Sequence, residues 1–393
     1  GTITNDDEDP DGPQTFTLTT GADTGDAFAG FGGDDTYEAP LGQGTVNGTE
    51  TAVPTLSGLD SIDAGEGNDT LNAELNEAGL VSTVDPTLES VDVINIEVSG
   101  AGEMPTMPPI FVPTNGALYQ YSEEEGDLDL QNVSGTQEVW LRDQDGGELL
   151  LTNSQEALTV GIRETSNGYL ELVNAQDAVS VEIRDTDSSY LVLEYAADVL
   201  GSGDASQSFT FDNAGTENAP VAVGVYTYGA DEITTANIGV QGDNVVSFYT
   251  GSDNPGNNGP TDTIETVNIT GDGSMTFTGA STLGVMTDLT LGGALDVDVS
   301  NVNAGSLDTV TVNGADDTTL DLGSNGFGSA GFSYTGGDGD DVLKTAVGIS
   351  GGTVEDPTTI DGGEGDDTLQ VRAGESDVDL VATNPNDVPV VTG

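Results

Sequence analysis

The sequence predicts an all-β protein, a parallel β-solenoid or β-roll with coils of about 21 residues and glycine-rich turns towards both ends. Short runs of Val, Ile and Leu alternate with polar residues and are separated by Gly, Asn and Asp, as strands and turns require. Leucine pairs recur every 21 residues in the middle of the chain. A nonapeptide rich in Gly and Asp recurs near each end.

The nonapeptide has the form G-G-x-G-x-D-x-U-x, where U is apolar. Residues 336–344 and 362–370 fit it without a mismatch, and degenerate copies begin at Gly30 and Ala64. Glycine permits positive φ and close backbone approach, the aspartate supplies a carboxylate, and the apolar residue points into the roll. Carboxylate and carbonyl oxygens are the ligands that calcium prefers. The pattern therefore predicts calcium-binding turns, against the plainer interpretation that these Gly-Asp runs are surface turns.

Each site is expected to combine carboxylates with carbonyl oxygens of its glycine turn. The expected carboxylate ligands are Asp26, Asp35, Asp60, Asp69, Asp341 and Asp367. The acids expected either to bind or to add negative field are Asp338, Asp340, Asp361 and Glu364. The glycines whose turns are expected to complete the sites are Gly33, Gly67, Gly337, Gly339, Gly363 and Gly365. Clustered carboxylates repel each other without metal, so we expect calcium binding to be coupled to folding.

The spacing of these motifs also bears on how the turns stack. Asp26 lies nine residues before Asp35, and Asp60 lies nine residues before Asp69. Ile360 likewise precedes Leu369 by nine. We therefore expect pairs of nine-residue turns, stacked on each other, that hold an ion between them.

Composition limits the partners of this chain. Its 393 residues include 70 acidic and 5 basic ones, with a net charge of -65 and neither His nor Cys. Binding to nucleic acid or to an anionic membrane surface needs basic residues to neutralise phosphate, so both are poor partners for this chain, and we expect no nucleic acid partner. No apolar run is long enough to span a bilayer, so we expect no membrane insertion. The absence of Cys fits a secreted protein that is stabilised by metal rather than by disulfides.

The residue types argue against catalysis. General acid–base and nucleophilic mechanisms usually rely on His, Lys or Cys, and the chain has a single Lys. Paired carboxylates can hydrolyse glycosides, but among 70 acids the proximity of two is uninformative. We therefore expect that the protein is not an enzyme.

The middle of the chain carries side-chain ladders, which predict coils of two strands and two turns that rise about 4.8 Å per coil. The positions that recur every 21 residues are Arg142, Arg163 and Arg184; Asn132, Asn153 and Asn174; Leu141, Ile162 and Ile183; and the pairs Leu128/Leu130, Leu149/Leu151, Leu170/Leu172 and Leu191/Leu193. The pattern returns at intervals of 22 and 21 in Val267/Ile269, Leu289/Leu291 and Val310/Val312.

The polar ladders have alternative interpretations. The arginines could form a strip that binds an acidic sugar, but the acids that follow each of them favour mutual neutralisation along one face. Those acids are Asp143, Glu164 and Asp185. The asparagines are expected at a turn, where their amides bond up the stack. Trp140, Tyr169 and Tyr190 could stack on sugar rings, although packing is the favoured role.

Two stretches break the pattern and are expected to leave the solenoid wall. Residues 101–116 carry four prolines together with Met104, Met107, Ile110 and Phe111, and residues 251–261 form a polar Gly/Asn/Pro loop. An apolar excursion on so charged a chain needs a cover. Contact with another copy and packing back on the same solenoid both stay open.

These features divide the chain into four segments. We expect a first calcium-binding segment in residues 14–75, the solenoid body in 76–330 and a second calcium-binding segment in 331–393. Before them, in residues 1–13, Gly1-Thr2-Ile3-Thr4 followed by acids resembles the last strand of a Calx-beta domain, which implies the end of a preceding domain and its linker.

The four nonapeptides make the chain resemble the RTX proteins, which bacterial type I systems secrete and extracellular calcium folds. Residues 59–71, 88–96 and 264–269 are similar to the repeated strands of S-layer proteins and large adhesins. The resemblance implies a calcium-dependent extracellular structural protein that self-assembles into a surface layer, filament or adhesin stalk. The alternative is a polysaccharide-binding or polysaccharide-modifying β-solenoid of a secreted RTX protein, with a cell-surface polysaccharide as partner.

Overall fold

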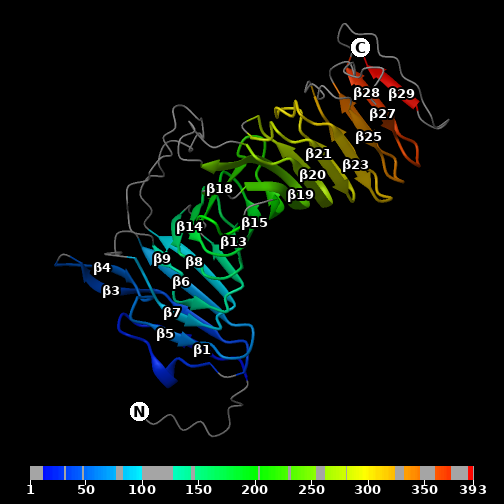
Figure 1. Ribbon diagram of the computed structural model, residues 1–393. Helices are drawn as coiled ribbons and strands as arrows, with labels where there is room; N and C mark the ends of the chain where they lie inside the picture. Colours follow the sequence, from blue (N-terminus) through cyan, green and yellow to red (C-terminus); the bar gives the residue numbers. More distant parts are fainter. Residues whose placement is uncertain are drawn as a thin grey trace. The chain divides into compact units, whose positions relative to one another are not determined.

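The computed structural model describes residues 12–30, 32–46, 48–76, 83–99, 127–142, 147–201, 204–228, 232–253, 262–279, 281–323, 332–345, 359–372 and 388–392. The chain is all-β, a parallel β-solenoid of about 11 turns whose stacked coils lie about 25 residues apart (Figure 1). This confirms the predicted fold class. The chain forms two compact units, which are described separately. Unit 1 comprises Gly1–Val112, Ala117–Val181 and Tyr190–Val199, and unit 2 comprises Pro113–Gly116, Glu182–Ser189 and Leu200–Gly393.

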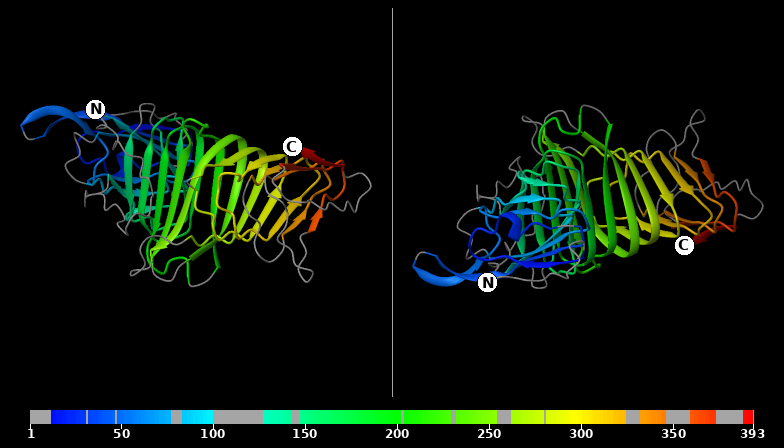
Figure 2. Two further views of the ribbon diagram at one scale, coloured as in Figure 1. Left: turned by 90° about the horizontal axis from the view of Figure 1, so that it is seen from above. Right: turned by 90° about the horizontal axis from the view of Figure 1, so that it is seen from below.

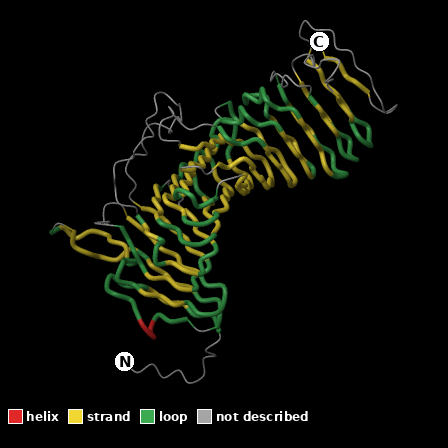
Figure 3. The backbone as a smooth tube through the Cα atoms, viewed as in Figure 1, coloured by secondary structure: helices red, strands yellow, loops and turns green. Residues whose placement is uncertain are grey.

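Unit 1 builds three walls of parallel strands. The first wall stacks β1 (Thr15–Thr17), β2 (Thr36–Ala39), β6 (Thr70–Asn76), β8 (Val93–Ser99), β11 (Glu138–Leu141) and β13 (Leu158–Arg163). The second stacks β9 (Leu128–Asp129), β12 (Glu148–Thr152), β14 (Tyr169–Ala175) and β16 (Tyr190–Tyr195), and the third β5 (Ser61–Asp63), β7 (Thr87–Glu89) and β10 (Val133–Ser134). A short 3-10 helix, η1 (Gly25–Ala27), is the one red segment in Figure 3.

Residues between the first two nonapeptides fold as a hairpin. Strands β3 (Leu41–Val46) and β4 (Thr49–Pro54) pair antiparallel, with Leu41 opposite Pro54 and Val46 opposite Thr49. Because the hairpin pairs with itself, the coils on either side of it still stack, and Tyr37 pairs with Leu71.

Unit 2 continues the same construction. Strand β15 (Val179–Thr186) begins in unit 1 and ends in unit 2, and it is followed by β17 (Asp204–Ala214), β18 (Val221–Tyr228), β19 (Glu232–Asp253) and β20 (Thr266–Phe277). One wall then stacks β21 (Asp288–Gly292), β23 (Thr309–Asn313), β25 (Ser333–Thr335) and β27 (Thr359–Asp361) on β20. The other stacks β22 (Leu295–Asp298), β24 (Thr319–Asp321), β26 (Val342–Thr345), β28 (Thr368–Arg372) and β29 (Val388–Thr392) on the second half of β20. Figure 2 shows these strands lying side by side within each unit.

The core follows from the alternation of side chains along each strand. Leu149, Leu170 and Leu191 occupy one register on β12, β14 and β16 and are all buried. In unit 2 Met275, Val297 and Leu320 form an equivalent buried stack. Each coil therefore adds a layer of apolar side chains that only its neighbours can cover, which is why coils are stable as a stack rather than alone.

The 21-residue period is correct for the coils that contain Leu149, Leu170 and Leu191 and wrong for the coil before them. Leu149 and Leu170 pair across 21 residues, but Leu151 pairs with Leu128 rather than with Leu130. The coils differ because insertions such as the β3–β4 hairpin lengthen some of them. The later intervals of 22 and 21 are confirmed, since Val267, Leu289 and Val310 share one register.

Several expected features fall outside the described residues. These are the opening segment 1–11, the whole proline-rich stretch 101–116 with Met104, Met107, Ile110 and Phe111, and residues 254–261. Within the part that is described, no helix is long and apolar enough to cross a membrane.

The outer side of the second wall carries a carboxyl group that titrates near neutrality. Glu171 on β14 accepts a 2.9 Å hydrogen bond from the Tyr169 hydroxyl. Burial raises its pKa to about 7, and the negative charges of Glu194 and Glu148 add to that rise while the Tyr169 bond opposes it. Its ordinary value is 4.5. At a pH between these two values, Glu171 is therefore protonated in the folded chain and ionised in the unfolded chain.

Replacing Glu171 by Gln should flatten the pH dependence of stability between pH 5 and pH 8. In the parent, the folded state binds more protons than the unfolded state between the two pKa values. The contribution of Glu171, at most about 3 kcal/mol, is therefore fully present at low pH and lost as pH rises through 7. Gln keeps the acceptor for Tyr169 and has no charge to bury. Urea unfolding at several pH values measures the difference, with the exposed Glu50→Gln as control, and parallel curves for the parent and Glu171→Gln would contradict it.

Candidate functional site

The first wall of unit 1 begins at a rank of stacked aspartates. Asp35 Oδ1 accepts the backbone N–H of Gln14 at 2.7 Å, and Asp69 Oδ1 accepts that of Asp35 at 2.7 Å. Asp92 Oδ2 accepts the N–H of Asp69 at 2.8 Å. Each carboxylate thus caps the equivalent position on the preceding coil. Asp35 is 1% exposed and Asp69 is 0% exposed.

The second oxygen of two of these carboxylates lacks a hydrogen bond. Within the described part of the chain, Asp35 Oδ2 and Asp69 Oδ2 are buried and have no partner, and neither has the Tyr37 hydroxyl. Burial, followed by the charges of Asp35, Asp92 and Asp34, raises the pKa of Asp69 above its usual value. A buried carboxylate oxygen without a partner is costly, and a bound cation would remove that cost.

The glycine turns beside this rank bring backbone carbonyls close together. Gly67 has φ +145°, and a Cβ added to it would lie 2.2 Å from the carbonyl oxygen of Gly33. Gly30 is equally restricted, because its Cβ would lie 1.9 Å from the Ala64 oxygen and 2.7 Å from Asp35 Oδ2. The Ala64 carbonyl oxygen and Asp35 Oδ2 therefore lie close to each other beside Gly30, and carboxylate and carbonyl oxygens are the donors that calcium prefers.

Unit 2 repeats the rank, and there Asp341 is more fully satisfied than Asp35 or Asp69. Asp341 accepts N–H groups from Thr318 at 3.0 Å and from Gly337 at 2.8 Å, one on each oxygen. Asp367 Oδ1 accepts the N–H of Asp341 at 3.0 Å. An outer rank runs in parallel, in which Asp317 caps Asp340 at 2.9 Å and Asp340 caps Asp366 at 2.8 Å. Glycines stack here too, with an added Cβ at Gly363 lying 2.0 Å from the Gly337 oxygen and one at Gly365 lying 2.4 Å from the Gly339 oxygen.

Asp60 lies on the third wall of unit 1 and not in the aspartate rank of the first wall. It precedes β5 on the third wall, where its oxygens accept N–H groups from Asp23 at 2.9 Å and Ser57 at 2.7 Å. Burial raises its pKa. The expectation that nine-residue turns stack on each other is therefore wrong. Nine residues take the chain from one wall to the next within a single coil, since Ile62 pairs with Leu88 whereas Leu71 pairs with Tyr37 and Ile94.

The other predicted ligands lie at the surface or outside the described side chains. The exposed ones are Asp338, Asp340, Asp361 and Glu364. Asp26 lies in η1, and its side chain is not among those described. No group of three or more acidic side chains in the described residues converges as a metal cluster. A calcium ion here would therefore depend on carbonyl oxygens as well as on carboxylates.

Sequence reasoning missed the residues that extend the two ranks. Asp92 follows Ser90-Val91, with no glycine beside it, and was recognisable only by its 23-residue separation from Asp69. Asp317 and Thr318 lie in Gly314-Ala315-Asp316-Asp317-Thr318-Thr319-Leu320, which aligns with residues 337–343 once Thr is accepted in place of Asp. Neither Asp92 nor residues 314–320 belong to an unbroken nonapeptide.

Each arginine of the predicted ladder contacts a specific side chain. Arg142 pairs with Glu164 and Arg184 with Glu182, so neutralisation is the observed role of these two arginines. Arg163 instead lies 4.6 Å above the centre of the Trp140 ring, which is 1% exposed and therefore packed rather than open to a sugar.

The asparagine ladder is confirmed in part. Asn174 Nδ2 donates to Asn153 Oδ1 at 2.6 Å, and both residues have left-handed φ, at 63° and 59°. Asn153 in turn donates to Asp129 at 3.0 Å, in the place that the period assigned to Asn132. Asn132 donates to Asp85 at 2.9 Å because the chain has already turned towards the third wall.

No protein-family model matches this chain, and no curated protein sequence matches it. Its function therefore has to rest on the chemistry of the site.

Replacing Gly67 by Ala should destabilise unit 1 far more than replacing Gly25. Both have positive φ, but an added Cβ at Gly25 has nothing within 4 Å, whereas at Gly67 it meets backbone of the adjacent coil. We expect about 1 kcal/mol for Gly25→Ala from the left-handed conformation alone, and about 3 kcal/mol or more for Gly67→Ala. Urea unfolding followed by circular dichroism measures both, and equal losses would show that close coil contact is not what selects Gly67.

Proposed function

We propose that the protein is a calcium-stabilised structural β-solenoid of the bacterial cell surface, without enzymatic activity. The observation that carries the proposal is the pair of buried carboxylate oxygens, Asp35 Oδ2 and Asp69 Oδ2, that have no hydrogen-bond partner in the described residues. They lie beside glycine turns whose carbonyls belong to adjacent coils. Calcium takes six to eight oxygen ligands of these two kinds.

Electrostatics supports the same proposal. The chain has a net charge of -65, and stacking coils places its acids one above another. Asp35 and Asp69 are part of one stack with no basic side chain among their hydrogen-bond partners. A divalent ion between them would supply the missing positive charge and connect two coils, so its binding free energy would add to the stability of the folded state.

The larger role rests on the sequence. RTX-like nonapeptides near both ends, the absence of Cys and the extreme acidity favour secretion by a type I system into calcium-containing surroundings. A stack of repeated coils with few basic residues suits a structural role better than catalysis. Self-assembly into a surface layer, filament or adhesin stalk is the use that fits these properties.

The effect of Asp69→Asn on stability should depend on calcium: neutral or stabilising in chelator, and destabilising relative to the parent when calcium is bound. In chelator the variant should be at least as stable as the parent, because Asn keeps the Oδ1 acceptor for Asp35 and removes a buried charge. With calcium at 100 times its Kd, the parent should gain about 2.7 kcal/mol that the variant does not. Thermal unfolding in both conditions measures this, with the exposed Asp177→Asn as control. A parent melt that calcium does not shift would contradict the proposed site.

Calcium should also control assembly. Purified protein examined by negative-stain microscopy should form ordered polymers in millimolar calcium, and these should disappear with chelator and not form in magnesium, because magnesium demands a stricter octahedral geometry. Monomers under all three conditions would rule out self-assembly while leaving the Asp35–Asp69 site to be judged by the melts.

A further inference from the structure

A polar groove of about 580 Å³ crosses the outer face of the first wall in unit 1, apart from the aspartate rank. Its floor follows one register position through three coils, from Glu38 on β2 to Asn72 on β6 and Asn95 on β8. Glu74 and Glu97, paired in the next outward position, form its side. The Arg142–Glu164 ion pair closes one end.

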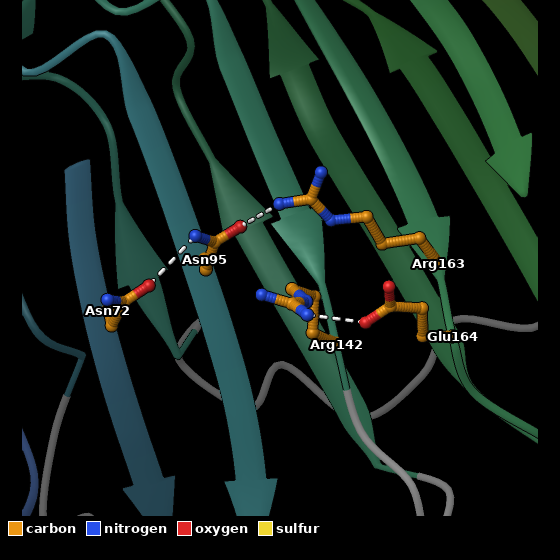
Figure 4. Close-up of polar contacts among 5 residues, drawn as sticks. All are labelled: Asn72, Asn95, Arg142, Arg163 and Glu164. Atoms are coloured by element: carbon orange, nitrogen blue, oxygen red, sulfur yellow. Dashed lines mark hydrogen bonds and ion pairs between the residues drawn. The ribbon is translucent and has the colours of Figure 1, made fainter. Parts of the chain in front are cut away.

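The floor is held by a continuous chain of hydrogen bonds. Arg163 donates to Asn95 Oδ1 at 2.5 Å, Asn95 Nδ2 donates to Asn72 Oδ1 at 2.9 Å, and Asn72 Nδ2 donates to Glu38 Oε1 at 2.9 Å. Figure 4 shows the chain from Arg163 to Asn72, with the Arg142–Glu164 pair beside it. These hydrogen bonds order the side chains of the floor before any ligand binds, which lowers the entropy cost of binding.

The cation at the start of this chain is also fixed. Arg163 lies over Trp140, whose register partner on the next strand is Gly161. Because Gly161 has no side chain, the arginine can extend back across the tryptophan to reach Asn95. The groove floor is therefore ordered by residues from five coils, and its orientation depends on the stacking itself.

The groove selects against several ligand classes. Its titratable lining consists of Glu38, Glu74, Glu97 and Glu164 against the single Arg142, so it repels polyanions such as uronic acid polymers. Its predominantly polar lining offers no place for a lipid or an apolar peptide. Carboxylates alone would suit a basic peptide, but a lysine or arginine side chain has no acceptor for the amide N–H groups of the floor.

Hydroxyl groups can use both kinds of lining group. Each floor amide spends one of its two N–H donors within the chain of hydrogen bonds and keeps the other, while the glutamates are acceptors. Adjacent hydroxyls of a sugar ring are donors and acceptors at once. The lining repeats at the strand spacing of about 4.8 Å, which is comparable to the length of one pyranose unit. We infer that this groove binds a neutral or amino-substituted saccharide chain that runs across the strands.

The test measures binding of defined oligosaccharides to the full chain in calcium. Fluorescently labelled hexamers of β-1,4-linked glucose, N-acetylglucosamine and glucosamine are titrated, together with oligogalacturonate and oligolysine. At least one of the first three should bind saturably. Asn72→Ala with Asn95→Ala should weaken that binding about tenfold or more, since it removes the preorganised floor. Glu97→Arg, at an exposed position of β8, should do the same.

A matched pair in unit 2 serves as control. Asn268 Nδ2 donates to Asn237 Oδ1 at 2.9 Å across β20 and β19, in register and away from the groove, so Asn237→Ala with Asn268→Ala should leave affinity unchanged. Circular dichroism confirms that each variant is folded. Binding of none of the three hexamers, equal binding by Glu97→Arg and the parent, or preference for oligogalacturonate would each overturn the inference. Binding of oligolysine alone, lost in Glu97→Arg, would replace it with a basic-peptide site.

Discussion

Parallel stacking of one coil on the next is the constraint on which the other features of this protein depend. Main-chain hydrogen bonds hold Tyr37, Leu71 and Ile94 in one register, and every neighbouring side chain then forms a ladder of its own. A buried leucine ladder is favourable because each layer removes apolar surface from water. The same geometry stacks acids, amides and glycines, so stability and function are decided by what each ladder contains.

Stacking acids about one strand spacing apart is unfavourable, and the described coils compensate in three ways. Backbone N–H groups satisfy both oxygens of Asp341, an arginine from another coil pairs with Glu164, and an amide separates Glu38 from its next neighbours. At Asp35 and Asp69 none of these compensates the second carboxylate oxygen, which is buried and has no hydrogen-bond partner in the described residues. Both residues lie at glycine turns, where a cation is the remaining compensation.

The sequence predicted which residues form ladders better than it predicted which residues pair between adjacent coils. Leu149, Leu170 and Leu191 were placed correctly because a repeated apolar residue can only point inward. Leu128 was misplaced because turn lengths between strands vary, and a shift of two residues preserves the inward direction while it changes the partner. Asp92 was missed because its hydrogen bond to Asp69 depends only on its place on the adjacent coil, and no sequence motif marks that place.

By itself the sequence determined the fold class, since alternating apolar residues and glycine turns at recurring intervals allow few other structures, and it identified the glycine and aspartate types that suit calcium. Only the tertiary structure decided which residues meet. Asp60 and Asp69, nine residues apart, lie on different walls, whereas Asp35 and Asp69, 34 apart, are hydrogen bonded. Register depends on the length of every insertion between two strands, and main-chain hydrogen bonds across coils fix it only when the whole stack has formed.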